Sequence, residues 1–356
     1  MLIIILRQLQ LIKKKSNLPL LFLNFFSLRI YFRMLLAGFC CLFANIKNVT
    51  AQKNTIDYER LLVDGKLEIT IAQGFTEEAQ QRAGEAMQPL YLYNLADLKK
   101  YCTENAFTFI GQQGGCVQLY EKKQVIRYKN SRQEMSEQEV LVQLRIIKPN
   151  GAESLAAFEE AFLHSEVLIY QGHGRRGLGP DFDAIKIADG NFLISLNSTL
   201  HAKGLAQAPG DRSYPKVSIK NNFLDKLNSE KKWSDEIKYR IWFFNACNTR
   251  FYLDELRSDL IPKNVRENAD YLLTSDLVSL YTGAATSLVF LDDLLQNAPL
   301  EDLPNKLYKT QQQTLLKSDI YDPKIIATYR PCYFWNFYKN NAFVTKKSTP
   351  SKKNKK

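Results

Sequence analysis

Two residues that do covalent chemistry each follow an apolar run in this sequence. His173 stands between two glycines, directly after the run at 167–171, and Cys247 closes a second run at 240–247. A thiol is a strong nucleophile as a thiolate, and a nearby imidazole is able to accept the proton that it loses. The two residues therefore predict nucleophilic catalysis, provided that the fold brings them together.

The segments that must position these residues alternate between strands and helices. Short apolar runs predict strands, and longer stretches with apolar residues on one helical face predict helices. A hairpin is expected around Gly114-Gly115, between 107–120 and 123–129. The predicted strands are 89–94, 140–147, 167–171, 240–247 and 269–276, and the predicted helices are 95–105, 153–165, 251–261, 283–295 and 303–318.

This order predicts an α/β fold, a three-layer α/β/α sandwich around a mostly parallel sheet, because strands without polar alternation are covered on both faces. In such sheets, ligands bind outside the carboxyl ends of the strands. His173 and Cys247 both follow such an end, so we expect them on one edge of the sheet. Glycine beside the histidine leaves room for a substrate carbonyl. The N–H groups of Gly174 and Cys247 would then converge on the oxyanion that develops there.

The segments VLIYQGHG and RIWFFNACN resemble the two-part signature of the caspase-like cysteine peptidases. This group includes caspases, metacaspases, legumains, separases, clostripain and gingipains, and the resemblance covers about 139–295. It implies that Cys247 is the nucleophile, that His173 is the general base and acid, and that the N–H groups of Gly174 and Cys247 form the oxyanion hole. It implies no metal or other cofactor.

The resemblance has one departure from compact members of the family. The gap from His173 to Cys247 is 74 residues, and the excess lies in a polar, Lys-rich stretch at about 185–238, which we interpret as an insertion. The glycine-rich segment after the histidine lacks the Lys-Ser/Thr ending of a P-loop, so a nucleotide site is disfavoured.

The pocket for the substrate side chain is predicted only in outline. By the resemblance, the residue two before the cysteine, Asn245, helps to shape it. A pocket for Arg or Lys needs a carboxylate, and Asp276 is the first candidate because the strand after the catalytic one commonly lines the pocket in this family. The further candidates are Asp181 and Asp183 for a basic side chain, and Arg175 and Arg176 for an acidic one.

The net charge of +11 is concentrated at the two ends of the chain. Residues 1–51 hold seven basic and no acidic side chains, and residues 346–356 hold six lysines and no acid, which leaves −2 for residues 52–345. A nearly neutral body without a basic stripe disfavours a nucleic-acid partner. The basic tail is expected to be disordered, with at most weak contact to anionic surfaces.

The first 51 residues have the order of a secretory signal. Arg29 and Arg33 precede the apolar run at 35–46, and the small residue Ala51 follows it. We therefore expect an exported protein, periplasmic, cell-surface or secreted. The alternative is a single N-terminal membrane anchor over 18–46.

The body is expected to comprise two parts. An N-terminal α/β part at 52–135, with the option that it begins the same sheet, precedes the catalytic domain at 136–345. Four cysteines lie outside the leader, and their spacing matches no zinc site. Cys102 and Cys116 are a candidate disulfide in an exported protein.

The expected function is that of a bacterial, exported cysteine endopeptidase that hydrolyses protein or peptide substrates through an acyl-enzyme. Two other classes stay open. One is a non-catalytic caspase-like α/β binding module outside the cytoplasm, and the other is a membrane-anchored scaffold. The sequence makes no prediction of the oligomeric state.

Overall fold

The computed structural model of the chain describes the body of the protein. The described residues are 56–80, 86–174, 179–183, 230, 233, 238–259, 261–298, 302–318, 323–326 and 332–337. All of them belong to the second of the two units into which the chain divides, Asn54–Lys356. The leader at 1–51, the tail at 346–356, Arg175, Arg176 and nearly all of 185–238 lie outside them, so the predictions made there stay predictions.

Strands and helices alternate through the described chain. The strands are β1 (Lys66–Gln73), β2 (Ala79–Gln80), β3 (Gln88–Pro89), β4 (Thr108–Gln113), β5 (Val117–Lys129), β6 (Met135–Ile147), β7 (Val167–Gly172), β8 (Arg240–Ala246), β9 (Ala269–Thr274) and β10 (Tyr333–Asn336). The α-helices are α3 (Tyr58–Leu61), α4 (Leu90–Glu104), α5 (Ala152–His164), α7 (Leu253–Leu256), α8 (Lys263–Arg266), α9 (Gly283–Leu295), α10 (Leu303–Lys317) and α11 (Pro323–Ile326). Two short 3₁₀ helices are η3 (Thr249–Tyr252) and η4 (Leu280–Thr282).

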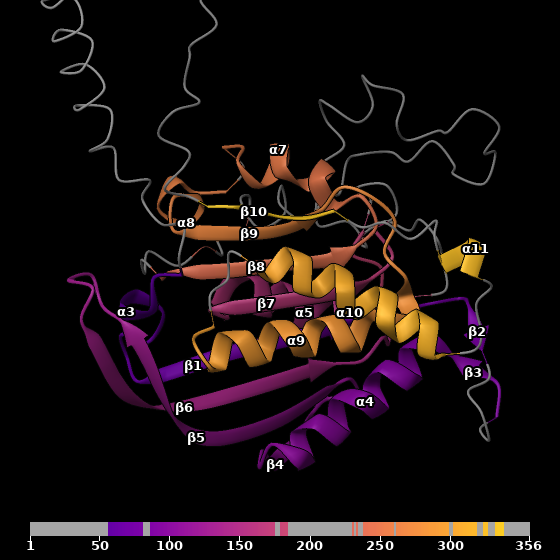
Figure 1. Ribbon diagram of the computed structural model, residues 1–356, viewed down its shortest axis with the longest axis horizontal. Helices are drawn as coiled ribbons and strands as arrows, with labels where there is room; N and C mark the ends of the chain where they lie inside the picture. The colour runs from indigo at the N-terminus through magenta and orange to yellow at the C-terminus, as the bar shows by residue number, and fades with distance from the viewer. Residues whose placement is uncertain are drawn as a thin grey trace, which may run out of the picture. The chain divides into compact units, whose positions relative to one another are not determined.

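Eight of the strands form one sheet in the order β10-β9-β8-β7-β1-β6-β5-β4 (Figure 1). The five strands from β9 to β6 run parallel to one another. The outer strands β10, β5 and β4 are antiparallel to their neighbours. The predicted α/β fold with a mostly parallel sheet is confirmed.

Each face of the sheet carries its own hydrophobic cluster, as expected for strands that are buried on both sides. Helices α4, α9 and α10 pack on one face, where Ile69 of β1 and Phe243 of β8 contribute to the cluster (Figure 1). Helices α5, α7 and α8 pack on the other face with Tyr170 of β7 and Trp242 of β8. This arrangement makes the three layers of the sandwich.

Strand β1 is a central strand that the sequence-based prediction missed. It pairs with β6 on one side and with β7 on the other. The connection from β1 to β6 runs through α4 on one face, and the connection from β6 to β7 runs through α5 on the other. The chain thus passes from β1 to β6 on one side of β1 and then returns to β7 on its other side. This reversal of strand order makes the boundary of β1 and β7 the topological switch point where α/β sheets bind ligands.

The predictions for individual elements succeed except at two places. Helices α5, α9 and α10 and the hairpin of β4 and β5 lie where predicted. The predicted strand at 89–94 is wrong, because α4 begins at Leu90 and buries Leu90, Asn94, Leu98 and Tyr101 at helical spacing. The predicted helix at 251–261 shrinks to η3 and α7. Pro262 follows directly and disfavours a helical conformation in the residue before it.

The candidate disulfide is also wrong. Cys102 and Cys116 are both free and buried. Cys102 lies on α4 and belongs to the hydrophobic cluster on that face of the sheet, whereas Cys116 belongs to the cluster on the opposite face. A disulfide needs Cα atoms about 4.4–6.8 Å apart, and the sheet itself separates these two.

Candidate active site

The register of β7 and β8 brings the histidine and the cysteine to one place. Gly172 is the register partner of Ala246 in this parallel pair. His173 and Cys247 are the next residues on their strands, so the chain delivers both to the same edge of the sheet. Neighbouring strands lie only about 4.8 Å apart. The expectation that the two residues share a sheet edge is confirmed.

Gly174 makes the closest contact between the two turns. A Cβ atom at this position would lie 2.1 Å from the carbonyl oxygen of Cys247 and 3.1 Å from its nitrogen. Real Cβ atoms do not approach backbone so closely, so only glycine fits here. The backbone of Gly174 thus lies directly against that of Cys247, the two residues predicted to form the oxyanion hole.

Two buried tyrosines hold the histidine turn. The hydroxyl of Tyr170 donates to the carbonyl of His173 (3.0 Å) and accepts from the N–H of Asp181 (3.0 Å). The hydroxyl of Tyr252 donates to the carbonyl of Gly174 (3.2 Å). Because both rings are anchored in the core under the sheet edge, the turn is fixed from below.

The Cys247 thiol is held by the turn that follows β9. The N–H of Val278 donates to Sγ (3.3 Å), and the thiol donates back to the Val278 carbonyl (3.4 Å). Burial raises the pKa of the Cys247 thiol, and the negative charges of Asp276 and Glu78 raise that pKa further. The cysteine is therefore a protonated thiol at neutral pH and needs a base before it acts as a nucleophile.

His173 faces two carboxylates that sequence reasoning missed. Its Nε2 lies 2.7 Å from a carboxylate oxygen of Glu77 and 3.3 Å from one of Glu78. Both glutamates follow β1. Because that strand was not predicted from the sequence, there was no reason to place them at this edge of the sheet. Their only signal in the sequence is that they come after the alternating segment LEITIA, which ends at Ala72.

The same three side chains form a candidate metal-binding group. Donor atoms of Glu77, Glu78 and His173 all lie within 4.8 Å of one another. Nitrogen and carboxylate oxygen are ligands that a zinc ion accepts. The prediction that the chemistry needs no metal stays a prediction.

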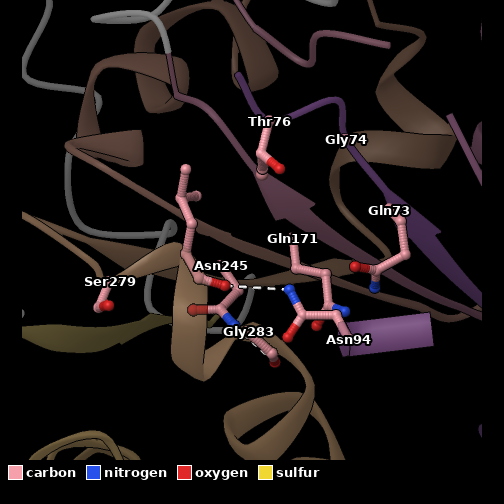
Figure 2. Close-up of a pocket in the computed structure, with 10 residues that line it drawn as sticks. Gln73, Gly74, Thr76, Asn94, Gln171, Asn245, Ser279 and Gly283 are labelled. Atoms are coloured by element: carbon pink, nitrogen blue, oxygen red, sulfur yellow. Dashed lines mark hydrogen bonds between the residues drawn. The ribbon is translucent and has the colours of Figure 1, made fainter. Parts of the chain in front are cut away.

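A small cavity opens at the carboxyl ends of β1, β7 and β8, at the switch point (Figure 2). Its empty volume is about 230 Å³, counting the part open to solvent. It adjoins the dyad, because Gly172 in its wall precedes His173 and Ser279 in its wall follows Val278. The polar side chains among its described lining are Gln73, Thr76, Asn94, Gln171, Asn245 and Ser279.

Of the predicted pocket residues, the structure brings one into this lining. Asn245 lies in the wall, and its amide donates to Thr286 Oγ1 (2.7 Å) while it accepts from the Tyr333 hydroxyl (3.1 Å). Asp276 is exposed and accepts from the N–H of Leu277 (2.8 Å).

The other two predicted pocket residues lie outside the described cavity lining, although the Asp181 carbonyl accepts from the N–H of Phe75 (2.9 Å), next to Gly74 in the wall. Asp181 is buried beside Tyr170, and Asp183 lies near Gly151 at the start of α5. Neither these two aspartates nor Asp276 is among the described residues that line the cavity. The roles predicted for them stay predictions.

Comparisons with family models, with curated proteins and with solved structures find no match to this chain. The geometry of the sheet edge is therefore the basis for a functional assignment.

Proposed function

We propose that this protein is a cysteine endopeptidase of the caspase-like kind, which hydrolyses peptide bonds through a Cys247–His173 dyad. The observation that carries the proposal is the register of β7 and β8. It supports a dyad because two residues 74 apart in the sequence follow adjacent strands at the same level. The position of the cavity beside them, at the switch point of the sheet, adds support.

The proposed reaction begins with proton transfer, because burial keeps the thiol protonated. His173 takes the proton from Sγ, and the sulfur electron pair attacks the scissile carbonyl carbon as the carbonyl π electrons move to oxygen. The N–H groups of Gly174 and Cys247 stabilise that oxyanion. His173 then donates the proton to the leaving nitrogen as the C–N bond breaks, which leaves a thioester.

Deacylation runs the same steps with water. Water gives a proton to His173 and attacks the thioester carbon, and the C–S bond breaks as the thiol regains its proton. The Glu77 carboxylate lies 2.7 Å from Nε2, where it is placed to orient the imidazole ring in both halves of the reaction. The substrate class is a protein or peptide, and the chemistry uses no cofactor.

A second candidate is a non-catalytic binding module with the same fold. The observation that favours it is the pairing of the Cys247 thiol with both backbone groups of Val278. A thiol held in this way acts as a small buried side chain rather than as a nucleophile. Reactivity of the thiol toward a peptide electrophile separates the two candidates.

The test is labelling of the full chain with peptidyl acyloxymethyl ketones, with the modified residue located by mass spectrometry. We expect labelling at Cys247, none in Cys247→Ala, and at least about hundredfold slower labelling in His173→Ala. Cys332→Ala is the matched control, because Cys332 is an exposed cysteine outside the proposed dyad and its loss should change nothing. Equal peptide hydrolysis by wild type and Cys247→Ala would overturn the proposal.

We propose export on the sequence alone. Within the described residues, no helix has the length and apolar composition needed to cross a bilayer. The predicted anchor at 18–46 lies outside those residues. N-terminal sequencing of the mature protein separates the alternatives, because a chain that starts at Gln52 has lost the anchor segment.

A further inference from the structure

The cavity beside the dyad is polar but carries no charge among its described lining residues. Its volume of about 230 Å³ includes space open to solvent, so the enclosed part is smaller still and lies well below the roughly 300–1,000 Å³ of pockets that hold whole small-molecule ligands. A cavity of this size next to a scissile bond accommodates at most the end of one side chain. Its chemistry therefore bears on which residue of a substrate it accepts.

Two glutamines in the wall are buried, and some of their amide atoms have no hydrogen-bond partner among the described residues. Gln73 is 1% exposed, and neither its Oε1 nor its Nε2 has a hydrogen-bond partner among the described residues. Gln171 is 3% exposed; its Oε1 accepts from the Ser287 hydroxyl, and its Nε2 lacks a partner there. Figure 2 shows both side chains at the cavity. Buried polar atoms are nearly always paired, so these groups are available to a ligand.

The two asparagines in the same wall behave differently. Asn94 donates to the Leu280 carbonyl (3.0 Å, dashed in Figure 2) and accepts from the N–H of Ala284 (3.1 Å). Asn245 is likewise paired on both sides of its amide. These asparagines hold the cavity in shape, whereas the glutamines offer it free hydrogen-bonding groups.

Ser279 adds a third free group from the opposite wall. Its N–H donates to Gln311 Oε1 (3.2 Å), which fixes its backbone. Its hydroxyl oxygen is buried and has no partner among the described residues. The cavity thus presents donors (Gln73 Nε2, Gln171 Nε2), an acceptor (Gln73 Oε1) and a hydroxyl that serves as either.

We propose that this cavity binds the carboxamide side chain of an Asn or Gln residue that directly precedes the scissile bond. This inference rests on the proposed peptidase function. A carboxamide has one acceptor oxygen and two N–H donors, so it satisfies the glutamines and the serine together. A carboxylate would meet the acceptor Gln73 Oε1 without a cation, and an ammonium or guanidinium would meet no carboxylate in the described wall. Asp276, which lies outside the wall, gives a basic side chain no partner inside it.

The first test compares peptidyl acyloxymethyl ketones that differ only in the residue next to the ketone: Asn, Gln, Asp, Glu, Lys, Arg and Ala. We expect the full chain to react with the Asn or Gln probe at least about a hundredfold faster than with Asp, Glu, Lys or Arg. Preference for a charged residue, or equal rates for all, overturns the carboxamide proposal while leaving the peptidase intact. Absence of labelling by every probe contradicts the peptidase itself.

The second test removes the free amide. The selectivity is measured as the labelling rate of the better carboxamide probe, Asn or Gln, divided by that of the Ala probe. In Gln73→Leu this ratio should fall at least about tenfold, because a donor and an acceptor are lost together. The thermal stability of the variant should stay level or rise, since an unpaired buried polar group is removed. Gln118→Leu is the matched control, because Gln118 Oε1 also lacks a partner and lies outside the described lining. A Gln73→Leu variant that is folded and keeps its selectivity contradicts the proposal.

Discussion

The two ends of the parallel strands differ in how completely some of their buried polar side chains are paired. At the amino end, the Glu166 carboxylate accepts from Lys238 Nζ (3.0 Å) and from the N–H of Glu68 (2.7 Å). At the carboxyl end, buried amide atoms of Gln73 and Gln171 have no partner among the described residues. Glu166 is buried like Gln73 and Gln171, so burial alone does not explain the difference.

Paired and unpaired buried polar groups have opposite effects on stability. A buried polar group that is paired contributes to stability, and one that is left unpaired costs about 1–3 kcal/mol. Such a cost is retained where a ligand completes the pairing. The paired carboxylate at the amino end therefore contributes to stability, and the amide atoms at the carboxyl end fit the substrate pocket proposed above.

The largest effect is expected at the carboxyl end, at Gly174, where there is no room for a side chain. Gly174→Ala drives a Cβ into the Cys247 carbonyl, so we expect loss of Cys247 labelling and a fall of about 3 kcal/mol in the free energy of unfolding. Urea titration and the ketone probes measure the two effects. Gly115→Ala is the control, because the three atoms nearest to its new Cβ are the ends of the Glu153 and Asn150 side chains, not backbone. Normal labelling of Gly174→Ala would contradict the contact between the turns.

A substitution at the amino end should lower the stability of the protein without changing the labelling of Cys247. Glu166→Ala leaves Lys238 and the Glu68 N–H without their acceptor, so we expect a loss of about 2 kcal/mol in the free energy of unfolding. Glu160→Ala is the control, since its ion pair with Arg145 is exposed on the Glu160 side and should contribute less than about 1 kcal/mol. Labelling of Cys247 at a temperature where both variants are folded should match wild type. Reduced labelling of Glu166→Ala there would mean that the two ends are not separate.

The amino end should also show a pH dependence. Burial raises the pKa of Glu166, although Lys238 lowers it in part. The folded state therefore binds the proton more tightly than the unfolded state, whose pKa is about 4.3. The stability of wild type relative to Glu166→Gln should then decline as pH rises from about 4 through the raised pKa, by roughly 1 kcal/mol or less. Urea titrations at several pH values measure it, and parallel curves for both proteins would contradict this assignment.

The smallest effect concerns the thiol at the carboxyl end. Asp276 raises the pKa of Cys247, so Asp276→Asn should increase the thiolate fraction and speed alkylation by iodoacetamide about two- to threefold below that pKa. Asp259→Asn, at an exposed carboxylate that pairs with Arg266, should leave the rate unchanged. A slower reaction in Asp276→Asn would show that the carboxylate is not a neighbour of the thiol in solution.

The spacing of apolar residues was enough to predict strands that are buried on both faces and helices that are buried on one. The apolar runs of β7, β8 and β9 and the helical faces of α5, α9 and α10 were predicted from their spacing. The start of α4 was not, because its tyrosines and leucines suit a strand as well as a helix. Strand β1 was missed although its alternating segment LEITIA was visible, and with it Gln73 of the cavity wall and the two glutamates that face His173.

The sequence by itself determined the mostly parallel α/β sheet and the pairing of His173 with Cys247 at its edge, because each depends on a run of residues and on what ends it. Only the tertiary structure decided the central place of β1, the contact of Gly174 with Cys247 and the cavity amides that no described residue pairs. The physical reason is that whether a buried amide finds a hydrogen-bond partner depends on all the side chains packed around it, which come from distant parts of the sequence. The residues next to Gln73 in the sequence therefore do not show that no described residue pairs its amide.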